Sequence, residues 1–168
     1  MPVLNPDHLL DQAERLMAPP AGAPRQADLR RAISNAYYGL FHALITEAAD
    51  DFAGRTQRHT PRYALVYRSV DHRSLRRLCE DVIKATLPVK YSSFEPRGGF
   101  GTDLVAVATA VVDLQEKRLL ADYDPLFRAR TSDALLAVAT GRAALNRFRS
   151  VSNARRRAFV SLIVFAPR

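Results

Sequence analysis

Hydrophobic residues recur at helical spacing along most of the chain, and turn-forming residues separate the helical segments. In residues 7–17, leucine, alanine and methionine repeat every three or four positions, which indicates an amphipathic helix. Prolines and glycine in residues 18–24 predict a connecting turn. A longer helix is expected over residues 26–49, with Asp28 in its first turn, where a carboxylate suits the positive end of the helix dipole.

Three further helices are predicted after the polar loop of residues 50–59. Thr60 and Pro61 form a typical helix start, and this third helix is expected to extend to about Thr86. Residues 89–101 predict an irregular loop, because their glycines follow no strand and so lack the setting of a phosphate-binding loop.

The last two helices are expected over residues 103–120 and from Ser132 onward, the latter continuing through the arginines of residues 155–157. No strand or internal repeat is evident. We therefore expect a single all-α domain over residues 1–168, an up-and-down helical bundle of about five helices.

Composition narrows the class of protein. The net charge is +8, and arginine greatly outnumbers lysine among the basic residues. This bias fits contact with RNA or DNA phosphates, and it fits equally well an arginine-rich genome with solvated helix faces.

The chain has a single cysteine, Cys79, which lies among apolar residues, so an intramolecular disulfide is excluded. With no secretory signal and no apolar run long enough to span a membrane, a cytoplasmic location is expected.

The second helix carries an unusual polar stripe. On a helical wheel, Asn35, Tyr38 and His42 fall within about 40° of Arg31. The opposite arc is apolar and predicts the surface facing the core: Leu29, Ile33, Ala36, Tyr37, Leu40 and Leu44. The stripe is therefore expected to face away from the core, into a groove between helices or a dimer seam. Gly39 lies beside it and predicts close approach of a partner helix to the backbone.

The stripe also carries a resemblance. The string Arg30-Arg-Ala-Ile-Ser-Asn-Ala-Tyr-Tyr-Gly-Leu-Phe-His-Ala43 resembles the signature helix of HEPN-domain proteins. The segment Arg118-Leu-Leu-Ala-Asp-Tyr-Asp-Pro125 is similar to one that those proteins carry before their last long helix. The stretch Arg68-Ser-Val-Asp-His72 resembles a feature of the third helix in one branch of the family.

The resemblance implies a HEPN-like bundle that pairs as a homodimer and cleaves RNA without a metal or cofactor. Its active members have an arginine a few residues before the histidine, but Asn35 stands seven positions before His42, where that arginine would be. His42 would be the base. Arg31 would have to replace the missing arginine as the cation, and it could do so only imperfectly because its spacing from His42 differs.

Arg68 and His72 are four residues apart and would be neighbours on the predicted third helix. They could complete a composite site with the stripe, or they could be an exposed pair within a run of charges. The four histidines of the chain have no metal-like spacing, so no metal site is predicted.

Two kinds of function follow from the resemblance. The first is a metal-independent endoribonuclease with a degenerate motif, acting in prokaryotic RNA, stress or toxin–antitoxin biology. An antitoxin or a nucleotidyltransferase would be its partner. The alternative is a non-catalytic module that binds nucleotide or RNA, or that serves only dimerisation. The sequence leaves open whether the stripe is catalytic.

Overall fold

The computed structural model describes residues 4–19 and 21–167, and these residues form helices and connecting loops without a β-strand. The elements follow one another as α1 (Pro6–Met17), α2 (Gln26–Ala53), the 3-10 helix η1 (Arg55–Gln57), α3 (Pro61–Arg68), α4 (His72–Ile83), the 3-10 helix η2 (Val89–Phe94), α5 (Gly101–Tyr123), α6 (Thr131–Ser150) and α7 (Asn153–Val164).

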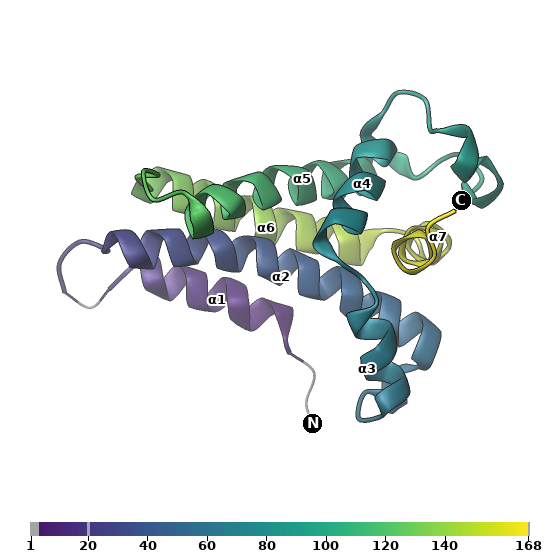
Figure 1. Ribbon diagram of the computed structural model, residues 1–168, viewed down its shortest axis with the longest axis horizontal. Helices are drawn as coiled ribbons and strands as arrows, with labels where there is room; N and C mark the ends of the chain where they lie inside the picture. The colour runs from purple at the N-terminus through teal and green to yellow at the C-terminus, as the bar shows by residue number, and fades with distance from the viewer. Residues whose placement is uncertain (1–3, 20, 168) are drawn as a thin grey trace.

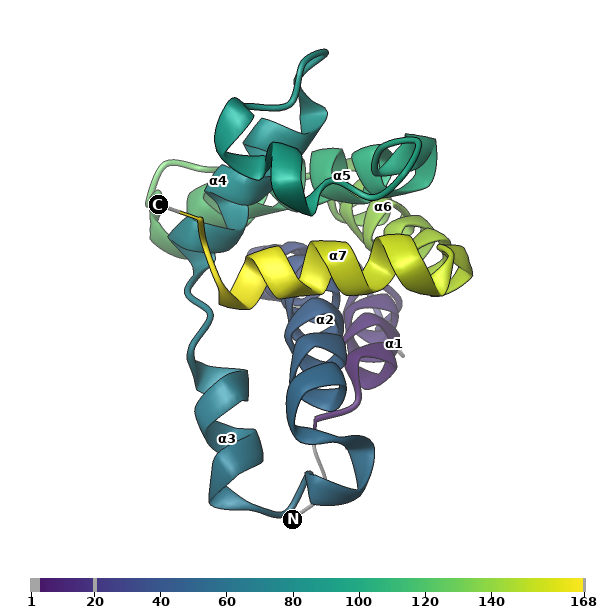
Figure 2. The ribbon, with the colours of Figure 1, turned by 90° about the vertical axis from the view of Figure 1, so that its right-hand side faces the viewer.

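Four helices run side by side along the length of the molecule. Figure 1 shows α2 between α1 on one side and α5 and α6 on the other, and Figure 2 shows α7 lying across the ends of these helices. Helix α2 contacts α1, α3, α5, α6 and α7. None of the helices in the described part of the chain is long and apolar enough to cross a membrane.

The all-α prediction is confirmed, but the count of about five helices is wrong. The predicted third helix is two helices, because Asp71 caps a new one: its Oδ1 accepts hydrogen bonds from the backbone N–H groups of Arg73 and Ser74, both at 2.8 Å. The predicted fifth helix also divides. Val151 has extended backbone (ψ 138°) and a buried side chain, and it separates α6 from α7.

Burial is most complete around α2. Sixteen of its 28 residues are buried, on almost every side of the helix. The six residues of the predicted apolar arc are all buried, as expected. Cys79 is buried in α4, which confirms its expected place in the core.

Two glycines allow the central helices to approach closely. At Gly39, an added Cβ would lie 3.1 Å from Cγ of Leu10 and 3.3 Å from the carbonyl oxygen of Pro6, so the backbone approach expected at this glycine is confirmed, with α1 as the partner. At Gly141, an added Cβ would lie 3.0 Å from the carbonyl oxygen of Ala36. The crossing of α6 over α2 therefore depends on the missing side chain.

We predict that Gly141→Ala destabilises the protein by about 1–3 kcal/mol in urea unfolding, because a helix backbone cannot move aside for the new methyl group. In an open helix the same substitution would stabilise by about 1 kcal/mol, so the sign of the change is the test. Ala139→Gly, at an exposed position of the same helix, measures helix propensity alone. A stability gain for Gly141→Ala would contradict the close crossing.

Candidate functional site

The candidate site surrounds Tyr38 on α2, where side chains of α3, α4 and α5 meet the central helix. Ser34 and Tyr38 are one turn apart on the side of α2 that faces α5, whereas Asn35 lies on the side that faces α1. Asn35 donates a hydrogen bond to Oε1 of Gln12 on α1 at 2.9 Å. The hydroxyl of Tyr38 accepts one from Arg118 of α5 at 2.7 Å. The polar stripe of α2 thus lies between α1 and α5.

The expectation that the whole stripe faces away from the core is wrong for Asn35. Only 1% of this residue is exposed, because α1 packs over it and satisfies its amide. Arg31, one turn earlier, is exposed, while Tyr38 and His42 are half-buried. A helical wheel of one helix could not show this, since the position of α1 decides which edge of the stripe is covered.

Arg118 is the centre of the site. Arg118 is only 8% exposed. Its guanidinium donates hydrogen bonds to the hydroxyl of Tyr38, to the carboxylate of Asp122 at 2.9 Å and to the hydroxyl of Tyr123 at 3.3 Å. It also lies over the rings of Tyr37, Tyr38 and Tyr123, at 5.9, 5.2 and 5.3 Å from their centroids. Burial opposes the charge of Arg118, but the hydrogen bond to Tyr38 and its anionic neighbours outweigh it and raise the pKa.

The backbone of α5 is fixed to α2 just beyond Arg118. The guanidinium of Arg30 donates to the carbonyl oxygens of Ala121 at 2.6 Å and Asp124 at 2.7 Å. A cation there suits the negative end of the helix dipole. The hydroxyl of Ser34 donates a hydrogen bond to the carboxylate of Asp122, and the same carboxylate accepts one from Arg118. The orientation of Arg118 is therefore set by groups on both helices.

Two histidines flank Tyr38. Nδ1 of His42 shares a hydrogen bond of 2.6 Å with the hydroxyl of Tyr67 on α3. Nδ1 of His72, the first residue of α4, shares one of 2.8 Å with the hydroxyl of Tyr37. The ring centroids of His42 and His72 lie 6.2 and 6.0 Å from that of Tyr38.

Arg68 does not join this group as predicted. Because the chain leaves α3 at Arg68 and re-enters a helix at His72, the two residues are not neighbours on one helix face. Arg68 is exposed, whereas the His72 ring is tilted against that of Phe41, with centroids 4.1 Å apart. The structure thus brings His72 to the stripe without Arg68.

Sequence reasoning missed Arg118, Tyr67 and Tyr37 as site residues. Only Arg118 had a signal, since it opens the second segment of the HEPN resemblance. Tyr37 lies on the apolar arc of α2, where its hydroxyl reaches His72 from a buried position. Tyr67 belongs to a short helix whose direction no local pattern specified.

Partial burial sets the protonation of the two histidines. It lowers the pKa of His42, and the nearby His72 lowers it further. Burial, followed by the positive charge of Arg118, also lowers the pKa of His72. Both imidazoles are therefore neutral at pH 7, and in the described residues no hydrogen bond engages Nε2 of either ring. In the tautomer in which Nδ1 carries the ring proton and donates it to the tyrosine, the free Nε2 can accept a proton from a bound ligand.

Other chemistries have less support. Burial raises the pKa of the Cys79 thiol, which makes this cysteine a poor nucleophile. Among residues 4–19 and 21–167, no three histidine, cysteine, aspartate or glutamate side chains are placed to hold a metal ion.

We predict that the free energy of unfolding falls as the pH is lowered from about 7.5 to about 5. The unfolded chain protonates its histidines near pH 6.5, whereas folded His42 and His72 resist protonation, so acid favours unfolding. His42→Gln and His72→Gln should each flatten this dependence in urea titrations, while His59→Gln, at an exposed position, should keep it. Asp7 affects stability only at a lower pH, because its hydrogen bond with Arg149 lowers the pKa of its carboxyl below 3.8. Its titration therefore does not overlap with that of the histidines. Equal slopes in all four proteins would contradict the assignment.

The chain was also compared with known proteins. No protein-family model, curated protein or solved structure matches it. The resemblance to HEPN-domain proteins therefore rests on the residues of the three segments quoted above, and each of these segments supplies one of the residues His42, His72 and Arg118 to the site. What the site can do must be argued from its own geometry.

Proposed function

We propose that this chain is a HEPN-like, metal-independent endoribonuclease whose reacting groups are His42, His72 and Arg118. One observation carries the proposal: two half-buried imidazoles and one guanidinium, from three different helices, converge on Tyr38. Two proton-transfer groups beside a fixed cation are the set that metal-free cleavage of an RNA phosphodiester requires.

In the proposed reaction His42 accepts the proton of the ribose 2′-hydroxyl through its free Nε2. The 2′-oxygen then forms a bond to phosphorus while the bond from phosphorus to the 5′-oxygen breaks. The small fraction of His72 that is protonated near neutral pH gives a proton to that leaving oxygen. The products are a 2′,3′-cyclic phosphate and a 5′-hydroxyl, and no metal or cofactor takes part.

Arg118 supplies the cation that the sequence reasoning sought in Arg31. The developing phosphorane carries extra negative charge, and a buried guanidinium stabilises it more strongly than an exposed one. Arg118 is largely buried and held in place by Asp122, whereas Arg31 is exposed. Arg31 would then contact a neighbouring phosphate of the RNA backbone.

The alternative of a non-catalytic RNA-binding module has its own supporting observation. Nε and Nη2 of Arg118 already donate to Asp122 and to two tyrosine hydroxyls. If these bonds persisted when RNA binds, the guanidinium would offer fewer donors to a phosphate. The site would then bind RNA through its charge and its tyrosine rings without cleaving it.

We predict cleavage of mixed RNA in the presence of a metal chelator, with an optimum below pH 7, because burial lowers the pKa of His72 and only its protonated form can act as the acid. His42→Ala, His72→Ala and Arg118→Lys should each slow cleavage by about 10²–10⁴-fold. His59→Ala removes an exposed histidine and should cleave at the wild-type rate.

The outcomes separate the alternatives. Salt-sensitive RNA binding without cleavage in the wild-type protein would replace the nuclease by the binding module. Neither binding nor cleavage would leave a dimerisation module. Cleavage that survives all three site variants would place the activity elsewhere.

We also propose that the protein is a homodimer that pairs through the end of α5. Leu119, Leu120 and Tyr123 lie on one face of this helix and are 44–67% exposed, and the following loop adds Leu126. A second copy on this face would lie beside Arg118. An antitoxin or nucleotidyltransferase partner, and a role in prokaryotic stress or toxin–antitoxin biology, are proposed from the resemblance alone.

Light scattering after gel filtration should give the mass of a dimer. Leu120→Glu should raise the dimer dissociation constant at least about tenfold, because it places a charge in an apolar contact. Leu65→Glu, on the exposed face of α3, is the matched control and should stay dimeric. A monomeric wild-type protein would overturn this proposal.

A further inference from the structure

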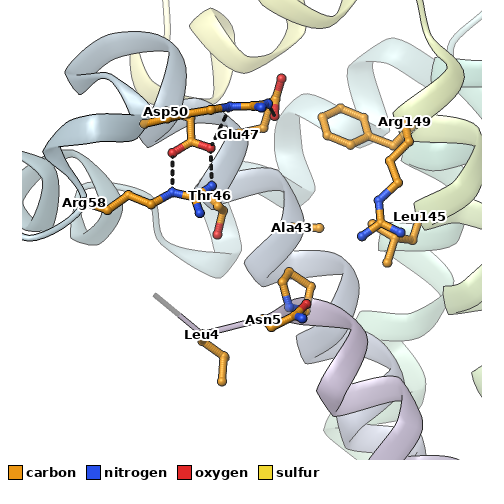
Figure 3. A pocket seen from close by; sticks show the side chains of 12 residues that line it. Leu4, Asn5, Ala43, Thr46, Glu47, Asp50, Arg58, Leu145 and Arg149 are labelled. Carbon is orange, nitrogen blue, oxygen red and sulfur yellow. Dashed lines mark hydrogen bonds and ion pairs between the residues drawn. The ribbon is translucent and has the colours of Figure 1, made fainter. Parts of the chain in front are cut away.

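A pocket lies apart from the site around Tyr38, and no histidine of the described residues lines it. It has a volume of about 390 Å³, within the range of pockets that hold small molecules. The start of α1, the second half of α2, the η1 segment and the end of α6 surround it, as Figure 3 shows. Its lining residues are Leu4, Asn5, Pro6, Ala43, Thr46, Glu47, Asp50, Arg55, Arg58, Leu145, Phe148 and Arg149. None of these belongs to the site around Tyr38.

Three arginines line this pocket, and Arg58 is fixed in place. Its Nε and Nη2 donate to the two carboxylate oxygens of Asp50 at 2.8 and 2.5 Å, and the hydroxyl of Tyr63 also donates to Asp50 at 3.1 Å. Asp50 is buried, so its charge is neutralised within this cluster. The Arg58–Asp50 pair therefore forms a neutral part of the pocket wall. The positive charge available to a ligand comes from the other two arginines.

The other two arginines can turn toward a ligand. Arg55 is 72% exposed, and its nitrogens lie 3.7 Å from Glu47 and 3.5 Å from Asp50, too far for strong hydrogen bonds. Arg149 pairs with Asp7, but Arg142 also lies 3.7 Å from Asp7 and can balance that carboxylate if Arg149 moves. In Figure 3, Arg149 faces the opening from the side opposite Arg58.

Both polar and apolar side chains line the pocket. Ala43, Leu145 and Phe148 supply the apolar part of the lining. The pocket thus combines arginines that can move with an apolar patch.

We propose that this pocket binds a small phosphate monoester with an apolar or aromatic group. The phosphate would lie between Arg55 and Arg149, since the guanidinium fork matches phosphate oxygens. The apolar group would lie over Ala43 and Phe148. This site is independent of the proposed nuclease site, so either proposal can fail without the other.

Phenyl phosphate is the probe, with phenol and inorganic phosphate as its two halves. Titration followed by amide NMR shifts should show submillimolar binding of phenyl phosphate, with shifts centred on residues 43–50 and 145–149. Each half should bind at least about tenfold more weakly, because it uses only the apolar or only the charged contacts.

Arg55→Gln and Arg149→Gln should each weaken binding of phenyl phosphate about tenfold or more. Both side chains are substantially exposed, so the variants should fold, which circular dichroism can check. Arg97→Gln removes an exposed arginine outside the pocket and should bind as the wild type does.

Three results would overturn the proposal. The first is the absence of binding at millimolar phenyl phosphate. The second is equal affinity for inorganic phosphate, which would reduce the site to a general attraction of anions. The third is an equal loss of affinity in Arg97→Gln, which would assign the effect to net charge.

Discussion

The enclosure of α2 is the constraint on which the rest of the structure depends. A 28-residue helix with neighbours on almost every side has little solvent for its polar groups, so each must find a partner in the protein. Ser34 finds Asp122, and Asn35 finds Gln12. These bonds join α2 to α5 and α1, so the same pairings that avoid unpaired polar atoms also fix how the neighbouring helices are oriented.

The candidate site arises where that enclosure is incomplete. Tyr38 and His42 lie on the edge of α2 between α1 and α5, where they are half-buried. Partial burial lowers the pKa of His42 and leaves Nε2 open to a ligand, while tyrosine hydroxyls orient both histidines. Full burial would block access, and full exposure would leave the rings free to rotate. The geometry thus favours chemistry at this edge over any other part of α2.

Much of the arginine content has a structural use. Arg142 of α6 pairs with Asp11 and Glu14 of α1, and Arg156 of α7 lies 2.8 Å from Glu47 of α2. These pairs are partly buried, and each joins two helices that are distant in the sequence. The net charge of +8 is therefore a poor guide to where RNA would bind. A largely buried arginine within a cluster of aromatic rings, such as Arg118, is a better guide to an RNA-binding site.

The sequence by itself determined the helical class, the apolar arc of α2, the core position of Cys79 and the close approach at Gly39. These features depend on local periodicity and on residue size, which one segment contains. It also singled out His42 and His72, but it joined His72 to Arg68 on a helix that Asp71 interrupts.

Only the tertiary structure decided that Asn35 is covered by α1, and that Tyr67 and Arg118 reach the stripe. The reason is physical: which edge of a helix is buried, and which distant side chains complete a site, depend on the packing of other helices, and that information is spread over residues many turns apart.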